Sequence, residues 1–183
     1  REGIDVYLRE AESLATRLGN QPVLIDVQNI RGRQARQDGR YGDAIAAFQR
    51  ALDLAQEAEH ASLEKAARNF LAMAYLDAEQ PDAALPHLWS ALEIARETGD
   101  RPGEGVILVN VGRAYLGLGQ PGLARGHLQA SLRITRQTDN RPAECAALTT
   151  LGDTHRADGE RDLAEGCYRQ ALHLARNLDD PRR

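Results

Sequence analysis

An all-α fold is the class that this sequence predicts, and three observations predict it. Ala, Leu, Arg, Gln and Glu dominate the composition while aromatic residues make up only 4%, which favours helix over sheet. Apolar and small residues recur at spacings of three and four, as on the buried face of an amphipathic helix. The whole pattern then returns every 40 residues. We therefore expect nine helices and no strand.

The period of 40 divides the chain into helix hairpins. Ala51, Ala91, Ser131 and Ala171 fall in register without a gap, and the flanking landmarks follow them. The division predicts a second helix of a truncated repeat at 1–20, four full repeats at 21–60, 61–100, 101–140 and 141–180, and the start of a missing or truncated helix at 181–183. The chain reads as a segment of a longer array, with one leading helix and four hairpins.

Each repeat is expected to contain a first helix, a tight turn and a second helix. Glycine at 39, 119 and 159 can adopt the left-handed conformation that ends the first helix, and Pro81 and Pro121 stand where a new helix tolerates proline. The predicted turns are Asp38 to Tyr41, Ala78 to Pro81, Leu118 to Pro121 and Asp158 to Arg161.

The junctions between repeats carry helix N-caps. Asn20, Asp100 and Asn140 each precede a proline by two residues, and Asp180-Pro181 belongs to the same set. His60 is the one position that departs from this pattern. The sequence therefore predicts that a first helix begins just after each capping residue.

A small residue recurs in both helices of every hairpin and should let their backbones approach closely. In the third repeat these residues are Gly112 and Ala124. We expect Gly112→Leu to overpack against Ala124 and to destabilise the fold by about 1–3 kcal/mol.

Charge and composition exclude several classes of function. The net charge of −4 offers no basic footprint for nucleic acid or for an anionic membrane, and no apolar run is long enough to span a bilayer. A cytoplasmic location is therefore expected. Cys145 and Cys167 are offset by about seven residues in the expected hairpin, which is too far for a disulfide.

No motif for catalysis or cofactor binding in the sequence has the structural context that it needs. The GLGQPG stretch at 117–122 has dinucleotide-fingerprint spacing, but it follows a helix. His87, His127 and Cys167 form a row that we interpret as a solvated outer face, because helix spacing separates its members too widely for one metal ion. His155 reads as a packed, hydrogen-bonded histidine. We expect no catalytic residues, no metal, no cofactor and no enzymatic activity.

The repeated pattern of Leu151-Gly152, an aromatic residue three positions later, a glycine turn, and then Ala, an aromatic or Leu, and Ala resembles the tetratricopeptide repeat (TPR). The resemblance covers residues 1–180 and implies a right-handed solenoid of antiparallel helix hairpins. The 40-residue length resembles that of bacterial signalling proteins, including SARP-like activators, STAND-type ATPases and peptide-sensing regulators. Arg31, Glu79 and His155 depart from the family pattern.

In the family, first helices line a concave groove that receives peptides or helices, so the resemblance implies a partner-binding groove here. Its members would be Asp26, Asn29, Arg33, Arg36, Asn69, Met73, Leu76, Val106, Val109, Asn110, Arg113, Thr149, Asp153 and Arg156. The set is apolar in its middle and basic at its ends, which suits a peptide with an apolar anchor and an acidic group. It lacks the basic cluster with which co-chaperone TPRs clamp a C-terminal carboxylate.

Three hypotheses of function follow. The favoured one is a protein-interaction scaffold, the regulatory module of a larger bacterial signalling or transcription-regulating protein, with no direct contact to nucleic acid or membrane. The second is a sensor for a small ligand or short peptide. The third is self-assembly into a homo-oligomer through exposed repeat ends.

Overall fold

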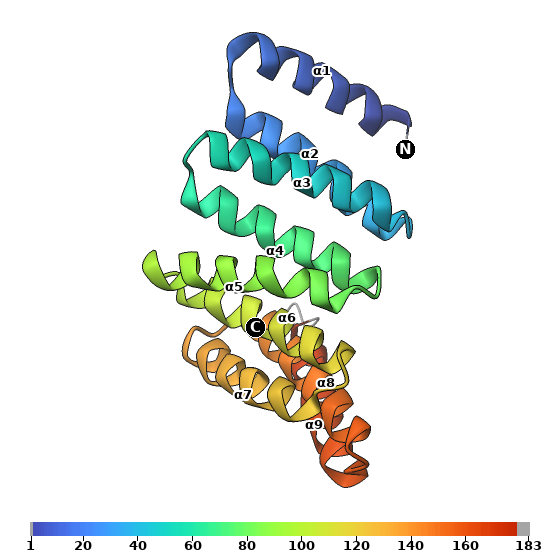
Figure 1. The fold of residues 1–183 in the computed structure, drawn as a ribbon. Coiled ribbons are helices and arrows are strands. Elements are labelled where there is room, and N and C mark those ends of the chain that lie inside the picture. The colour runs from blue at the N-terminus through green and yellow to red at the C-terminus, as the bar shows by residue number, and fades with distance from the viewer. Residues whose placement is uncertain (1, 179–183) are drawn as a thin grey trace. The chain divides into compact units, whose positions relative to one another are not determined.

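The computed structural model describes residues 2–178, and side chains within 6–177, as nine helices joined by short turns (Figure 1). The helices are α1 (Glu2–Leu18), α2 (Gln21–Gln37), α3 (Tyr41–Glu57), α4 (Ala61–Asp77), α5 (Pro81–Glu97), α6 (Arg101–Gly117), α7 (Pro121–Gln137), α8 (Arg141–Ala157) and α9 (Arg161–Leu178). No strand occurs in this part of the chain, so the predicted all-α class is confirmed. The expected start of a further helix at 181–183 lies outside the described residues.

The chain divides into two compact units, Arg1–Ile94 (unit 1) and Ala95–Arg183 (unit 2). Unit 1 contains the hairpin of α2 and α3 with α1 on one side and α4 on the other. Unit 2 contains the hairpins α6–α7 and α8–α9. We call α2, α4, α6 and α8 first helices, and α3, α5, α7 and α9 second helices.

The hairpin turns end each first helix with one residue in the left-handed conformation. Gly39 and Gly119 have φ of 72° and 69°, as the glycine positions predict. Glu79 occupies the equivalent turn position with φ of 57°, although a residue with a Cβ is sterically disfavoured in this left-handed conformation. Its turn closes in the same way, with the Gln80 N–H donating to the Tyr75 carbonyl at 2.9 Å. The repeat geometry therefore overrides the local preference of glutamate.

Four first helices begin with a side-chain cap. The side chains of Asn20, Asp100 and Asn140 each accept a hydrogen bond from the backbone N–H three residues later, as predicted. His60 departs from the sequence pattern in residue type and has no proline after it, yet it also caps its helix, because its Nδ1 accepts from the Leu63 N–H at 3.4 Å. An imidazole in the neutral form offers the same kind of acceptor as an Asn or Asp oxygen.

Each hairpin with a glycine in its first helix packs that glycine against a bulky side chain of the second. A Cβ at Gly112 would lie 2.6 Å from Leu128 Cγ, and one at Gly32 would lie 2.5 Å from the Phe48 ring. The sequence predicts that a side chain at position 112 would overpack against Ala124. In the structure, the nearest atoms to a Cβ at this position belong to Leu128. The bulky partner lies 16 residues after the glycine in each case, so the contact recurs with the repeat.

The core follows the same periodicity. In unit 1, Phe48 stacks on Phe70 with ring centroids 5.5 Å apart, and Leu52 of α3 and Leu71 of α4 belong to the same buried cluster. In unit 2, Leu132 of α7 and Leu151 of α8 repeat that arrangement. Among the described residues, no helix is both long enough and apolar enough to cross a membrane.

Candidate functional site

The first helices of unit 1 bring several predicted groove residues together. Neighbouring α2 and α4 are joined by an ion pair between Arg36 Nε and Asp77 Oδ2 at 2.6 Å. Met73 lies beside it, with its sulfur 4.0 Å from Arg36 Nη1 and 3.8 Å from Asn69 Nδ2. These contacts place a thioether, an amide and an ion pair on one surface, which is the surface that the predicted groove residues of α2 and α4 share.

Two further predicted residues of unit 1 extend this surface. Arg33 is exposed one turn before Arg36, and Leu76 is half-buried one turn after Met73. We define the first-helix face of unit 1 by Arg33, Arg36, Asn69, Met73, Leu76 and Asp77. It offers an apolar centre flanked by guanidinium groups, and Asp77 already neutralises one of them.

Asn29 does not belong to this face. Only 7% of the residue is exposed, and its Oδ1 is buried with no hydrogen-bond partner among the described residues. Asp26, one helical turn earlier, is exposed. Asn29, which was predicted to line the groove, is therefore buried in the interior of unit 1.

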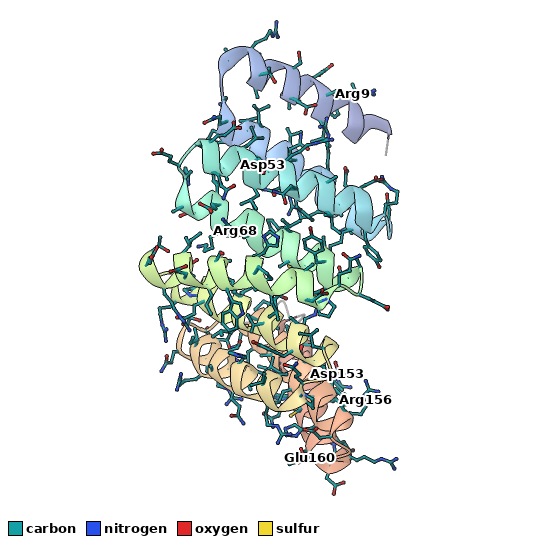
Figure 2. All side chains as sticks on the ribbon, in the orientation of Figure 1. Arg9, Asp53, Arg68, Asp153, Arg156 and Glu160 are labelled. Carbon is teal, nitrogen blue, oxygen red and sulfur yellow. The ribbon has the colours of Figure 1, made fainter. Side chains whose placement is uncertain are left out.

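In unit 2, a surface of the first helices contains Asp153 and Arg156. Figure 2 shows these two side chains on α8, where Arg156 Nη2 lies 3.5 Å from Asp153 Oδ1. The Tyr168 hydroxyl donates to the same carboxylate oxygen at 2.8 Å. A cavity of about 330 Å³ lies between Leu116 of α6 and Asp153, Arg156 and Ala157 of α8.

Burial in unit 2 corrects the prediction that the groove is apolar in its middle. Val109 is 4% exposed and packs in the core with Leu128 and Leu148, so it cannot contact a partner. Asn110 is also buried, and its Oδ1 accepts from Arg113 Nη1 at 3.4 Å. Val106 and Arg113 are half-buried, and Thr149 is exposed with its hydroxyl donating to the Cys145 carbonyl. α6 carries apolar residues around much of its circumference, so periodicity alone could not separate its core side from its open side.

The row of His87, His127 and Cys167 is not a solvated outer face. His87 stacks on Tyr75 with centroids 5.7 Å apart, His127 stacks on Tyr115 at 5.4 Å, and Cys167 is buried. Burial lowers the pKa of both histidines, and Arg68 and Arg96 respectively lower it further. The row therefore faces the first helix of each hairpin and helps to hold the two helices together.

The remaining chemical candidates behave as structural residues. Cys145 and Cys167 are free thiols, and burial raises the pKa of Cys167. His155 is buried with its Nδ1 2.5 Å from Glu160 Oε2, as expected for a packed, hydrogen-bonded histidine. The GLGQPG stretch spans the end of α6 and the start of α7. No cluster of three or more His, Cys, Asp or Glu residues that could hold a metal ion occurs among the described residues.

Sequence reasoning missed three residues of these surfaces: Asp77, Leu116 and Ala157. Asp77 follows Met73 by four positions and Asn69 by eight, so helical spacing alone could have placed it on the first-helix face. Leu116 and Ala157 lie near the ends of their helices, beyond the positions that the family pattern marks.

Comparison with known proteins identifies the repeat. A family model described as Tetratricopeptide repeat matches residues 23–97, 62–137 and 103–177. No curated protein sequence matches the chain.

Solved structures share the fold at low sequence identity. The crystal structure of BtubC from P. vanneervenii is 18% identical with a TM-score of 0.74, over 99% of this chain and 80% of that one. The apo form of RapI is 20% identical with a TM-score of 0.80, over 94% of this chain and 63% of its own. A Rap protein complexed with Competence and Sporulation Factor is 21% identical with a TM-score of 0.76, over 90% of this chain and 45% of its own. The chain thus spans less than two thirds of either Rap protein.

Proposed function

Because this chain belongs to the tetratricopeptide-repeat family, we propose that it is a protein-interaction module that binds a peptide or helix through its first helices. We further propose that it serves as the regulatory module of a larger bacterial signalling or transcription-regulating protein. A similar fold in a Rap protein was crystallised with Competence and Sporulation Factor, which supports a ligand-binding role for this architecture. That the chain is not an enzyme, and that it acts in the cytoplasm, stay predictions.

The observation that carries the proposal is the first-helix face of unit 1. Met73 and Leu76 provide half-buried apolar surface for an anchor side chain. Arg33 is exposed on the adjacent helix α2, whereas Arg36 is already paired with Asp77. An acidic group on the partner therefore has its best contact at Arg33, since binding at Arg36 would compete with an existing ion pair.

The experiment is a selection from a random peptide library displayed on phage, followed by affinity measurements with the selected peptides. We expect these peptides to combine an apolar anchor with at least one Asp or Glu. Arg33→Glu should weaken their binding by about 2 kcal/mol or more, because an attractive contact becomes a repulsive one.

The matched control is Arg133→Glu, which reverses the charge of an exposed arginine on the second helix α7. His127 is unsuitable as an outer-face control, because it stacks on Tyr115. Peptides without acidic residues, or binding that Arg33→Glu leaves intact while Arg133→Glu abolishes it, contradict the proposed face.

A second candidate function is a sensor for a small ligand or short peptide. The cavity of about 330 Å³ beside Asp153 and Arg156 in unit 2 favours it, since this volume lies in the range of small-molecule sites. A ligand that binds the folded state raises the melting temperature by mass action. A screen of short acidic and basic peptides by thermal shift tests this function, and the absence of any shift speaks against it.

Self-assembly through repeat ends is the third candidate, and it predicts a mass that grows with protein concentration. Sedimentation at several concentrations measures this directly. A constant monomer mass across the series excludes it.

A further inference from the structure

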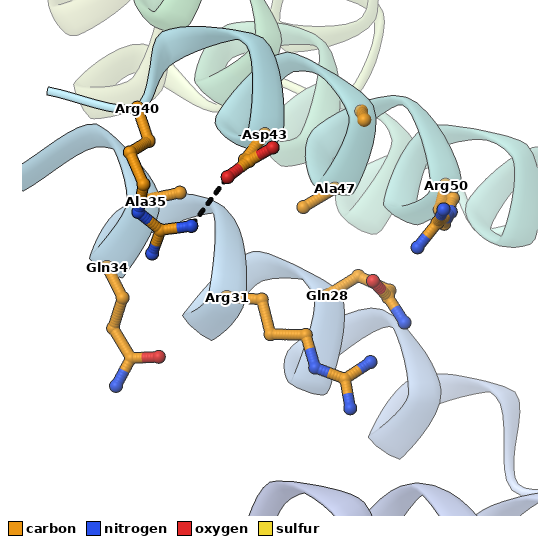
Figure 3. Close-up of a pocket in the computed structure, with 9 residues that line it drawn as sticks. Gln28, Arg31, Gln34, Ala35, Arg40, Asp43, Ala47 and Arg50 are labelled. Carbon is orange, nitrogen blue, oxygen red and sulfur yellow. Dashed lines mark hydrogen bonds and ion pairs between the residues drawn. The ribbon is translucent and has the colours of Figure 1, made fainter. Parts of the chain in front are cut away.

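A cavity of about 400 Å³ lies on the first hairpin, within unit 1 (Figure 3). Its walls come from one side of α2 and the facing side of α3. The lining residues are Gln28, Arg31, Gln34, Ala35, Arg40, Asp43, Ala46, Ala47 and Arg50. Alanine methyl groups therefore form its apolar part, and charged groups surround them.

The repeat explains why the cavity occurs in this hairpin. Ala35 stands in register with Tyr75 and Tyr115, and Ala47 stands in register with His87 and His127. In the second and third hairpins these positions hold stacked rings, with centroids 5.7 Å apart for Tyr75–His87 and 5.4 Å apart for Tyr115–His127, whereas the fourth hairpin has His155 and Cys167 there. The first hairpin has a methyl group in place of each ring. The cavity thus lies where the fold elsewhere accommodates two stacked aromatic rings.

The charges around the cavity are mostly positive. Three arginines and one aspartate line it. Glu12 of α1 binds Arg31 through two hydrogen bonds of 2.8 and 2.7 Å, and Asp43 binds Arg40 Nη1 at 2.5 Å. Arg50 is exposed and lies at the end of the cavity opposite Arg40 (Figure 3). Its positive charge helps to lower the pKa of Glu12. Guanidinium groups stack on aromatic faces and bind carboxylates with two parallel hydrogen bonds.

We propose that this cavity binds a planar aromatic ring that carries a carboxylate. The ring packs on the methyl groups of Ala35 and Ala47, in the place that the Tyr–His pair takes in the second and third hairpins. The carboxylate meets the guanidinium group of Arg50. A free aromatic acid and an aromatic residue at the C-terminus of a peptide both present this chemistry.

The test is a titration of the chain, followed by NMR, with N-acetyltryptophan as the probe. The methyl resonances of Ala35, Ala46 and Ala47 should shift in a saturable manner. N-acetyltryptophan amide, which lacks the carboxylate, and N-acetylleucine, which lacks the ring, should each bind about tenfold more weakly or worse, equivalent to about 1.4 kcal/mol. A short peptide that ends in Trp distinguishes the two sources, because tighter binding than the free acid identifies a peptide terminus as the occupant.

The decisive variant introduces the later pair into the first hairpin as Ala35→Tyr with Ala47→His. Because the same pair packs between α4 and α5, we expect the variant to fold and to lose the N-acetyltryptophan shifts. Arg50→Gln changes only an exposed side chain and should weaken binding about tenfold, whereas the control Arg133→Gln should have no effect. Unsaturable shifts in the native chain, or equal binding by the native chain and both cavity variants, would overturn the proposal.

Discussion

Glycine in the first helices is required by the bulk of a neighbouring side chain. Gly32, Gly112 and Gly152 have helical backbones, and each meets a large residue of the second helix: Phe48, Leu128 and Tyr168 respectively. The missing Cβ lets the large side chain lie directly on the backbone of the first helix. The sequence therefore predicted the close approach correctly but assigned it to the wrong neighbour.

Gly112→Leu should destabilise the fold by about 1–3 kcal/mol through overpacking against Leu128. Gly126→Leu is the matched control, because nothing lies within 4 Å of a Cβ at that position on α7. Chemical denaturation of both variants measures the difference. If the two variants were equally stable, the packing of α6 on α7 would have to be different.

The stacked histidines predict a dependence of stability on pH. Burial holds the pKa of His87 and His127 below the ordinary value of 6.5 in the folded state. Between the folded and unfolded pKa values the unfolded chain binds more protons, so stability falls as pH falls through this window. The melting temperature should therefore decrease between about pH 7.5 and about pH 5.5.

The double variant His87→Gln with His127→Gln should flatten this decrease, because it removes both titrating groups. His173→Gln, which changes an exposed histidine of α9, should leave the slope unchanged. A slope that survives the double variant would assign the pH dependence to other groups.

At the scale of elements, α1 binds α2 through a polar pair where the α3–α4 and α7–α8 junctions use leucines. Glu12 and Arg31 stand in register with Leu52 and Leu71 in unit 1 and with Leu132 and Leu151 in unit 2, and those leucines are core residues. Both members of the pair change together, so the polar contact remains matched. Arg31 holds the pKa of Glu12 below its ordinary value of 4.5.

A double-mutant cycle on this pair should give a coupling energy of about 0.5–1 kcal/mol, since the groups are partly exposed but bind through two hydrogen bonds. Glu12→Leu combined with Arg31→Leu restores the later arrangement and should be at least as stable as the native chain. Denaturation of the two single alanine variants and the double alanine variant measures the coupling energy, and denaturation of the double leucine variant measures the second quantity. Additive single effects would mean that the pair does not hold α1 on α2.

The Glu12 carboxylate also makes the stability depend on pH in the acid range. Its folded pKa is depressed, so its contribution is present above the unfolded value of 4.5 and is lost as pH falls through the folded value. In Glu12→Gln this part of the acid transition should be absent. An unchanged acid transition would show that Glu12 has no depressed pKa.

The boundaries of the elements could be predicted from the sequence because caps and turn glycines mark them. Asn20, Asp100 and Asn140 begin their helices as expected. His60 caps α4, and Glu79 adopts the left-handed conformation in the turn that follows it. Neither residue type is preferred in its position, so only the repeat register could have predicted these roles. An ion pair between the exposed Arg96 and the buried Glu104, repeated by Arg136 and Glu144, was also not predicted from the sequence, because its partners lie eight residues apart across a junction.

At the scale of the whole chain, the candidate site could be predicted only in part. Periodicity assigns a residue to a face of a helix, but it does not reveal how much of that face the neighbouring helices cover. Val109 and Asn110 are therefore buried although they lie on first helices, whereas Arg33 and Met73 remain accessible. The cavity of the first hairpin could have been anticipated, since Ala35 and Ala47 break a Tyr–His pattern that is visible in the sequence.

The central claim is that the chain binds peptides through first helices, and hydrogen exchange tests it most directly. Mass spectrometry would record amide protection along the chain with and without a saturating acidic peptide from the library selection. The account predicts added protection in α2 and α4, centred on Arg33 to Arg36 and on Asn69 to Asp77, with little change in α3 and α5. Protection confined to the second helices, with α2 and α4 unchanged, would contradict it.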